Sequence, residues 1–297
     1  MTRPTLGHRL EYLLFTAVTV VLQRLPERAA LGVGALVGWI SGSVLRIRRS
    51  VVLENLTRAF PEESASWRRR VATETYRHFG REGATLFRMR RLGPAQILER
   101  CEVGGLDLLS RAIEEGRGVV ALTGHLGNWE MAGAATAASG FPLDVVAKRQ
   151  ANLLFDTYVR ETRERLGMRV IYQTEAPRSV LRALRERRVV ALVADQNVLT
   201  GGLFVEFFGE EASTARGPAV LAARGGAEVA MMISRRLPGP AVRYSMRFVP
   251  VSYKRTSDPD ENARRLLRAY HAILEDGIRA APEQYFWFHK RWKTRPS

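Results

Sequence analysis

The sequence has few of the residues that build disulfide-stapled or thiolate-metal proteins. It contains one cysteine, Cys101, in 297 residues. A single cysteine excludes an internal disulfide framework and makes a cysteine-based metal site implausible. Nothing in the composition therefore requires an oxidising compartment.

Acidic residues are also scarce relative to basic ones. The chain has 46 Lys and Arg against 30 Asp and Glu, a formal net charge of +16 at pH 7. Such a surface attracts polyanions, which include nucleic acid, an anionic membrane and an acidic protein partner. Hydrophobic residues make up 46% of the chain, which is enough for the core of one large domain.

No uninterrupted apolar run reaches the roughly 20 residues of a full membrane span. Two shorter uncharged runs cover residues 12–23 and 29–45, with 12 and 17 residues. In the second run, small residues recur at four-residue spacing and permit close helix packing: Gly34, Gly38 and Gly42. A basic segment, 46–49, follows.

The position of these runs favours a membrane-associated N-terminus. We interpret residues 1–50 as a membrane-associated helix or hairpin whose basic flank lies on the cytoplasmic side, and residues 51–297 as the main folded domain. A pair of buried helices in a soluble protein is the alternative. A cleaved signal peptide fits poorly, because it has no place for the second run.

From residue 103 onward, short β-rich runs alternate with helical patterns. The runs are 118–123, 143–147, 169–172, 189–194, 228–233 and 242–251. The expected helices lie near 129–139, 152–166, 177–187, 215–224 and 259–280, and residues 61–92 indicate one or two more, strongly basic and amphipathic. This alternation predicts an α/β domain with a central mixed, mainly parallel sheet flanked by helices.

The segment TGHLGNWE, residues 123–130, follows a strand and carries one of only 5 histidines. His125 is expected at the carboxyl end of that strand, where open α/β sheets bind their ligands. Gly127 permits a tight turn, Asn128 is a helix N-cap candidate, and Glu130 falls in the first helical turn. A carboxylate there can bend back to one ring nitrogen and leave the other as a base. A hydrogen-bonded structural histidine is the other interpretation.

Two common catalytic patterns are absent from the sequence. It has no G-x-S-x-G elbow, which disfavours a covalent acyl-enzyme. The spacing at His125 is H-x4-E rather than H-E-x-x-H, with no second histidine nearby, which disfavours a metal site. We expect neither a metal nor an organic cofactor.

The segment GHLGNWE resembles the H-x4-E/D signature of the glycerolipid acyltransferase superfamily. It is most similar to the late lipid A acyltransferases, which add secondary acyl chains to a lipid A precursor. Further blocks resemble that family in the same order, at 191–197, 201–222 and 282–296. The resemblance covers about residues 103–296.

The resemblance implies a base mechanism. His125 would deprotonate an acceptor hydroxyl, which attacks the thioester of an acyl carrier protein or, second, of coenzyme A. Glu130 would orient the ring and support the imidazolium. Asn128 and the helix N-terminus would help to hold the segment or the thioester carbonyl.

Further substrate contacts are expected from the next βα unit. The family usually has Arg four residues before an Asn, whereas this sequence has Lys148 in that position, with Arg149 beside it and Asn152 as the Asn. We favour Arg149 as the cation that meets the substrate phosphate or the oxyanion, because a guanidinium offers a bidentate fork and an ammonium a point charge.

Asp195 and Gln196 follow another strand and are expected to line the same crevice. For Asp195, a strand-end cap or a salt bridge to Arg216 is the structural alternative. The next residue is Asn197, where the family often has an acidic residue.

We therefore expect an acyltransferase at the bacterial cytoplasmic (inner) membrane, with its catalytic domain on the cytoplasmic side. Its partners would be an acyl carrier protein, a glycolipid acceptor and membrane lipids. A related branch acylates phosphatidylinositol mannosides, usually with Asp closing the signature. A non-catalytic lipid-binding protein is the rival from another class.

The tail QYFWFHKRWK, residues 284–293, interleaves aromatic and basic residues. This pattern suits single-stranded nucleic acid, a lipid headgroup interface or a packed C-terminal hook. Nucleic-acid binding leaves the apolar runs and GHLGNWE unexplained, so we expect no nucleic-acid partner.

Overall fold

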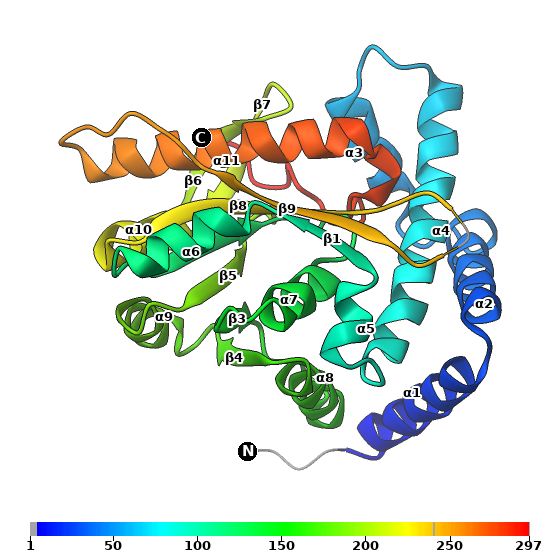
Figure 1. The fold of residues 1–297 in the computed structure, drawn as a ribbon. Helices are drawn as coiled ribbons and strands as arrows, with labels where there is room; N and C mark the ends of the chain where they lie inside the picture. Colours follow the sequence, from blue (N-terminus) through cyan, green and yellow to red (C-terminus); the bar gives the residue numbers. More distant parts are fainter. Residues whose placement is uncertain (1–4, 240, 297) are drawn as a thin grey trace.

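A seven-stranded mixed sheet forms the centre of the computed structural model, which describes residues 5–239 and 241–296 (Figure 1). The strand order is β1-β9-β8-β2-β5-β3-β4. The bounds are β1 Cys101–Gly104, β2 Val119–Thr123, β3 Leu143–Ala147, β4 Met168–Tyr172, β5 Val189–Val193, β8 Glu228–Arg236 and β9 Tyr244–Pro250. All neighbouring strands are parallel except β8 and β9. The predicted α/β class is confirmed.

Strand β2 lies inside the sheet and leads to the H-x4-E segment. Its five residues, VVALT, are all buried. It pairs in parallel with β5 on one side and β8 on the other. A run without polar alternation is what a parallel strand covered on both faces requires.

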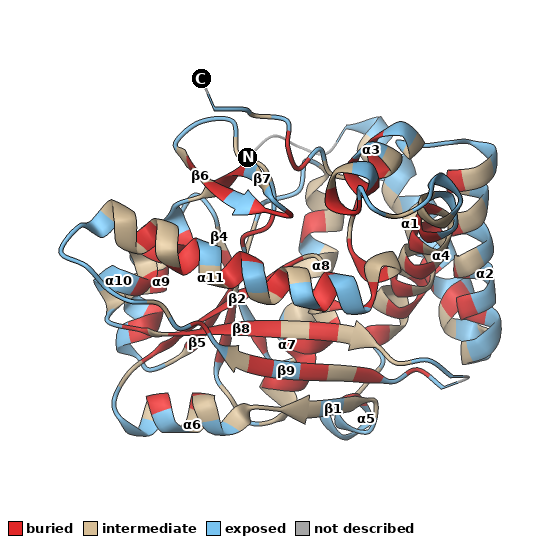
Figure 2. Cartoon of the chain, turned by 90° about the horizontal axis from the view of Figure 1, so that it is seen from above, coloured by how far each residue is buried: buried red, intermediate tan, exposed pale blue. Residues whose placement is uncertain are grey.

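Helices cover both faces of the sheet (Figures 1 and 2). One core includes residues of α9 Ala176–Arg185, α10 Gly217–Gly225 and α11 Pro259–Ala280. The other includes residues of α5 Pro94–Leu98, α6 Leu106–Glu114 and α7 Trp129–Ala138, with Leu166 at the end of α8 Leu153–Arg165. In Figure 2, buried residues are concentrated in the strands and on the sheet-facing sides of the helices.

A single long helix, α4 Ala65–Met89, accounts for the basic amphipathic segment. Ser64 caps it, because its side chain accepts a hydrogen bond from the Trp67 backbone N–H. Val71 near its start belongs to one core and Met89 at its end to the other. Helix α4 therefore passes from one face of the sheet to the other.

The N-terminal helices pack against this long helix. They are α1 Leu6–Arg24, α2 Glu27–Trp39 and a π-helical turn, Ile40–Val44, followed by α3 Arg49–Ala59. A Cβ on Gly38 would lie 2.0 Å from the Tyr76 carbonyl oxygen, and one on Gly34 would lie 2.3 Å from that of Gly80. The expected close packing through small residues is confirmed, and the partner is α4.

The outer faces of α1 and α2 expose large apolar side chains. Four leucines of α1 are 59–74% exposed, namely Leu6, Leu10, Leu13 and Leu14. Among the described residues, no single helix is both long and apolar enough to cross a membrane. Taken together, Glu27–Val44 and Arg49–Ala59 meet that length and composition test, with a bend of 88° between them.

Two features outside the main sheet complete the fold. One is a hairpin of β6 Gly202–Phe207 and β7 Glu210–Ala215, which was not expected from the sequence. Strand β1, at the edge of the main sheet, was not expected either. After the 3-10 turn Pro282–Gln284, the tail packs back into the core and buries Trp287 and Trp292. The tail aromatics are therefore largely core residues, as the packed-hook interpretation proposed.

Candidate active site

The H-x4-E segment follows the carboxyl end of β2 and leads directly into α7. Gly127 has φ of +62°, and a Cβ there would lie 2.2 Å from the Ser234 carbonyl oxygen, so the turn requires glycine. Asn128 is the N-cap of α7, and its Oδ1 accepts a hydrogen bond of 2.8 Å from the Met131 N–H. The expected cap is confirmed, and the turn presents His125 beyond the strand end.

Asp195, rather than Glu130, holds the ring of His125. The distance from Nδ1 to Asp195 Oδ1 is 2.7 Å, and the His125 backbone N–H donates to Oδ2 over 2.7 Å. An ionised carboxylate can only accept hydrogen bonds, so Nδ1 carries the ring hydrogen. Nε2 is then left without a hydrogen and is able to take up a proton. Gln196 Nε2 lies 3.4 Å from that nitrogen.

The two groups stabilise each other's charge. Burial alone would lower the pKa of His125, but the Asp195 carboxylate and, at longer range, Glu130 raise the pKa above its ordinary value. Asp195 is 2% exposed, and burial favours its neutral form. The hydrogen bonds and charge of His125, with the charge of Arg291, nevertheless hold the pKa of Asp195 below its ordinary value.

Glu130 pairs with Arg163 of α8 instead of the imidazole. Arg163 Nε lies 2.9 Å from Oε2, and a second guanidinium nitrogen bonds Oε1. Both side chains are largely buried. The expected bond from Glu130 to the ring is therefore replaced by one from Asp195, while the charge of Glu130 still contributes to the raised pKa of His125.

A cavity of about 240 Å³ opens beside the imidazole. Its lining includes His125, Glu130, Lys148 and Gln196. A second, apolar pocket shares Glu130 and Arg163 with this cavity and is otherwise lined mainly by hydrophobic residues: Phe15, Leu86, Phe87, Met89, Phe155, Tyr158, Val159 and Leu166. The Glu130–Arg163 ion pair thus lies between a polar cavity and an apolar one.

The other predicted contact residues occupy different places. Lys148 lines the His125 cavity, whereas the Arg149 guanidinium stacks 4.2 Å from the centroid of Tyr172. Asn152 caps α8 and donates to the His8 carbonyl oxygen over 2.9 Å. This geometry favours Lys148, not Arg149, as the cation at the site, and it gives Asn152 a structural contact with α1.

The alternative salt bridge for Asp195 does not form. Arg216 pairs with Asp260 at the start of α11. The cation near Asp195 is Arg291, which is buried and donates to the Ser213 carbonyl over 2.7 Å and to Thr214 Oγ1 over 2.6 Å. The sequence pattern of the tail gave no indication that Arg291 lies inside the protein.

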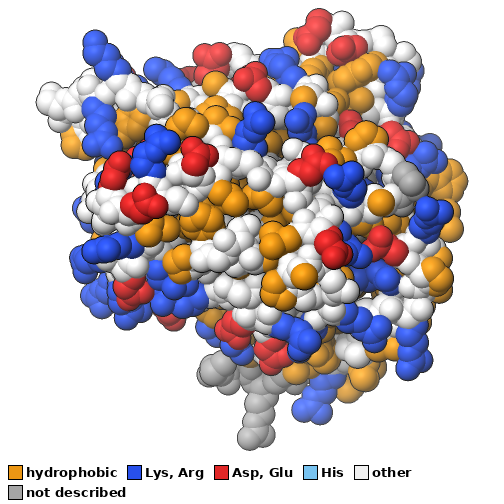
Figure 3. Space-filling model, in the orientation of Figure 1, with side chains coloured by type: hydrophobic (Ala, Val, Ile, Leu, Met, Phe, Trp, Pro, Cys, Tyr) orange, Lys and Arg blue, Asp and Glu red, His pale blue; other side chains and the backbone are white. Residues whose placement is uncertain are grey.

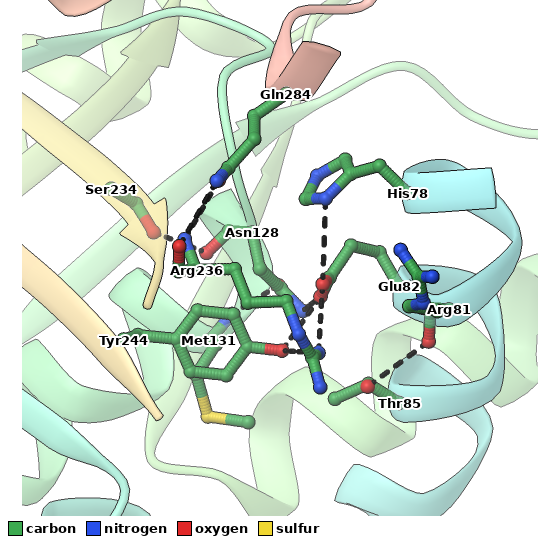
Figure 4. Close-up of polar contacts among 10 residues, drawn as sticks. All are labelled: His78, Arg81, Glu82, Thr85, Asn128, Met131, Ser234, Arg236, Tyr244 and Gln284. Carbon is green, nitrogen blue, oxygen red and sulfur yellow. Dashed lines mark hydrogen bonds and ion pairs between the residues drawn. The ribbon is translucent and has the colours of Figure 1, made fainter. Parts of the chain in front are cut away.

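Behind the turn that carries His125, residues 123–128, lies a polar network that the sequence analysis missed (Figure 4). Glu82 of α4 accepts hydrogen bonds of 2.7 Å from Asn128 Nδ2 and from Tyr244 Oη, and it pairs with Arg236 over 3.0 Å. Gln284 exchanges two hydrogen bonds with the Arg236 backbone, and its carbonyl accepts from the Gly127 N–H over 2.9 Å. Glu82 of α4 and Gln284 of the 3-10 turn therefore bond the His125 turn directly, while Arg236 of β8 and Tyr244 of β9 hold Glu82 in place.

No group of three or more metal-ligating side chains occurs in the described ranges 5–239 and 241–296. What the site offers is a hydrogen-bonded base, a nearby ammonium at Lys148 and the N-terminus of α7. These groups suit proton abstraction from a hydroxyl with stabilisation of a developing oxyanion.

Comparison with known proteins defines the class. The family model described as bacterial lipid A biosynthesis acyltransferase matches residues 4–294. The chain therefore belongs to this family and is an acyltransferase. The family resemblance noted from the sequence is confirmed.

Particular relatives differ in their acceptors. The chain is 31% identical to the phosphatidylinositol mannoside acyltransferase of Mycolicibacterium smegmatis over 76% of this chain and 75% of that protein. It is 26% identical to the lipid A biosynthesis palmitoleoyltransferase of Escherichia coli and 27% identical to the lauroyltransferase of the same organism. Each of these two alignments covers 92% of this chain and 88% of the relative.

Proposed function

We propose that this protein transfers a fatty acyl chain from the thioester of an acyl carrier protein to a hydroxyl of a lipid A precursor. The observation that carries the proposal is the His125–Asp195 pair, with both bonds at 2.7 Å, beside a cavity lined by Lys148. A base with a fixed tautomer is what hydroxyl activation needs.

In the proposed reaction, His125 Nε2 takes the proton of the acceptor hydroxyl as its oxygen attacks the thioester carbonyl carbon. Asp195 stabilises the imidazolium that forms, and Glu130 adds a second negative charge nearby. Lys148 and the N–H groups at the start of α7 stabilise the oxyanion of the tetrahedral intermediate. When the carbon–sulfur bond breaks, the imidazolium returns the proton to the leaving thiolate. Ester and free thiol are the products.

The apolar pocket beside Glu130 has a volume of only about 20 Å³, so it would receive the acyl chain once the side chains at its walls move apart. Its walls come from α1, α4 and α8, through Phe15, Phe87 and Phe155 among others. A chain lying there would pass the Glu130–Arg163 pair, so that its carbonyl reaches the cavity of His125. Side chains that narrow this pocket would then shorten the preferred acyl chain.

A second acceptor class is favoured by one observation. The relative with 31% identity acts, by its name, on phosphatidylinositol mannoside, whereas the two lipid A relatives cited above are 26% and 27% identical over longer alignments. Both acceptors are anionic glycolipids with free hydroxyls, which suits a protein of net charge +16.

We further propose that α1 and α2 associate with the cytoplasmic face of the inner membrane through their exposed apolar side chains. Replacing Leu10 and Leu14 by Asn is expected to release the protein from vesicles, because both leucines are exposed and their loss leaves the buried face of α1 unchanged. The matched control is Leu199→Asn, at an exposed leucine outside both helices. Equal vesicle binding by Leu10→Asn/Leu14→Asn and wild type would contradict the membrane role.

The acceptor is tested by offering the purified protein an acyl carrier protein charged with a fatty acyl chain, together with a tetra-acylated lipid A precursor or with a phosphatidylinositol mannoside. Mass spectrometry follows each acceptor. We expect one added acyl chain on the lipid A precursor. Acylation of the mannoside alone would assign the second acceptor. If neither acceptor gained an acyl chain from a thioester of acyl carrier protein or of coenzyme A, the enzymatic proposal would be overturned.

A further inference from the structure

A groove larger than the cavity of His125 and the apolar pocket beside Glu130 lies behind the turn that carries His125, between α2 and α4, and we call it the α2–α4 groove. Its volume is about 860 Å³, against about 240 Å³ for the cavity of His125. Residues of α2, α4, the end of β8 with the following loop, and the segment after α11 form its walls: Arg28, Gly32, Ala35, His78, Arg81, Arg235, Arg236 and Gln284 among them. None of its lining residues also lines the cavity of His125.

The groove carries an excess of unpaired positive charge. Within the described ranges, Arg28, Arg81 and Arg235 have no carboxylate within ion-pair distance. Of the acids that line the groove, Glu74 is paired with Arg77 over 2.8 Å, which leaves Glu283 alone against the three arginines. An anion entering the groove would gain their attraction without breaking an existing ion pair.

One wall of the groove is formed by side chains of the Glu82 network. His78 of α4 lines the groove but is buried, and its Nδ1 lies 4.0 Å from Glu82. Figure 4 shows the His78 ring linked to Glu82, with Arg81 about one turn further along the same helix. Arg236, which also lines the groove, pairs with the same carboxylate over 3.0 Å. The charge available to an anion therefore comes from the three unpaired arginines.

The surroundings of the groove indicate what binds there. Arg28, Gly32 and Ala35 line it from one side of α2, while Val33, Leu36 and Val37 of the same helix are 43–56% exposed. Figure 3 likewise shows hydrophobic and basic side chains side by side over the surface. An apolar surface beside an anion-binding groove matches an amphipathic molecule with a charged head, as at a membrane surface.

We propose that the α2–α4 groove binds the phosphate-bearing headgroup of a membrane lipid that is not the acyl acceptor. The arginines at positions 28, 81 and 235 contact the phosphate. The inference rests on the proposed membrane association of α1 and α2, but not on the chemistry of His125. A lipid held there would fix the protein on the bilayer with the turn that carries His125 on the other side of the Glu82 network.

The test is binding of the full-length protein to vesicles of phosphatidylcholine, alone and with phosphatidic acid added. Arg81→Gln/Arg235→Gln is compared with Arg182→Gln/Arg185→Gln, which removes the same charge from two exposed residues of α9 that have no ion pair within the described part of the chain. We expect the groove variant to bind the phosphatidic acid vesicles about tenfold more weakly than wild type, and the α9 variant to bind like wild type. Circular dichroism and thermal unfolding check that both variants fold.

Several results would overturn the proposal. Equal losses in the two variants would mean that only overall charge matters. Unchanged vesicle binding with lost binding to acyl carrier protein would assign the groove to an acidic protein. Equal competition by free pyrophosphate and by phosphatidic acid would assign it to a soluble phosphate. The vesicle-binding test contains no acyl donor, so a negative result there does not bear on the acyl-transfer proposal. Vesicle binding by Leu10→Asn/Leu14→Asn tests the membrane association of α1 and α2 by itself.

Discussion

The substitution Asp195→Asn separates an oriented catalytic base from a merely buried histidine. Asp195 bonds both the ring and the backbone N–H of His125 over 2.7 Å, so the amide keeps the size of the side chain while removing its charge. An amide can also present its NH2 group to Nδ1, which would favour the wrong tautomer. The expected defect is therefore in proton transfer rather than in folding.

The magnitude follows from the burial of the pair. Removing one partner of a buried ion pair costs about 3–5 kcal/mol. If the imidazolium of the transition state bears that loss, the rate falls by about 10²- to 10⁴-fold, at roughly 1.4 kcal/mol per factor of ten. Binding of the thioester, which Asp195 does not contact, should change little, so kcat falls while KM stays near the wild-type value.

The pH dependence of activity gives a second, independent test of the role of Asp195. Asp195 raises the pKa of His125 by stabilising its protonated form. The base must be neutral, so wild-type activity should rise with pH through that raised pKa. Without the carboxylate the pKa falls, and the acidic limb of the profile should move to lower pH.

The assay is the initial rate of acyl transfer from acyl carrier protein between pH 5 and 9, with Asp276→Asn, an exposed aspartate of α11, as the matched control. A variant with near wild-type kcat and an unmoved acidic limb would refute the assignment of Asp195.

Three further outcomes are expected. Glu130→Ala should abolish most activity. The double variant Glu130→Ala/Arg163→Met should remain inactive in the same assay. Recovered activity in the double variant would mean that Glu130 acts only by neutralising the buried Arg163. Glu82→Gln should lower kcat about tenfold with KM nearly unchanged, because it disturbs the hydrogen bond that fixes Asn128. Glu74→Gln, on the same helix, should have little effect. If Glu82→Gln and Glu74→Gln had the same kcat and KM, the Glu82 network would be structural only. Gly38→Ala should destabilise the protein by about 1–3 kcal/mol in urea unfolding, since its Cβ would meet the Tyr76 carbonyl. Gly83→Ala, where the Cβ meets nothing within 4 Å, should stabilise it, and a stabilised Gly38→Ala would contradict the α2–α4 packing.

Local patterns predicted the elements well, because the information lies within each element. The run before His125 is apolar at every position, as a strand buried on both faces must be. Asn128 precedes a helix as a cap should, and Asp258 caps α11 through the Asp260 N–H. The glycines at four-residue spacing indicated close packing, although not which helix would supply the partner.

The partner of His125 depended on strand pairing that no local pattern reveals. In the register of β2 and β5, Thr123 lies opposite Val193, and both His125 and Asp195 come two residues later. Adjacent parallel strands therefore bring together residues that are 70 positions apart. Glu130 is closer in sequence, but the first turn of α7 directs it towards Arg163 of α8.

The hairpin of β6 and β7 was missed because its turn residues are atypical. Phe208 and Gly209 both have positive φ, as a two-residue hairpin turn requires, but Asn-Gly or Asp-Gly is the usual signal. Phe208 accepts the strained conformation because its ring is buried against Phe60 and Trp287. Glu82 gave no signal either, since a carboxylate in a charged amphipathic helix usually faces water.

The most direct test of the account is the mass of the lipid A precursor after incubation with fatty-acylated acyl carrier protein and either the wild-type protein or His125→Ala. The account predicts one added acyl chain with the wild type and an unchanged acceptor with the variant, while circular dichroism shows both to be folded. The same mass gain with His125→Ala would contradict the claim that this imidazole is the base.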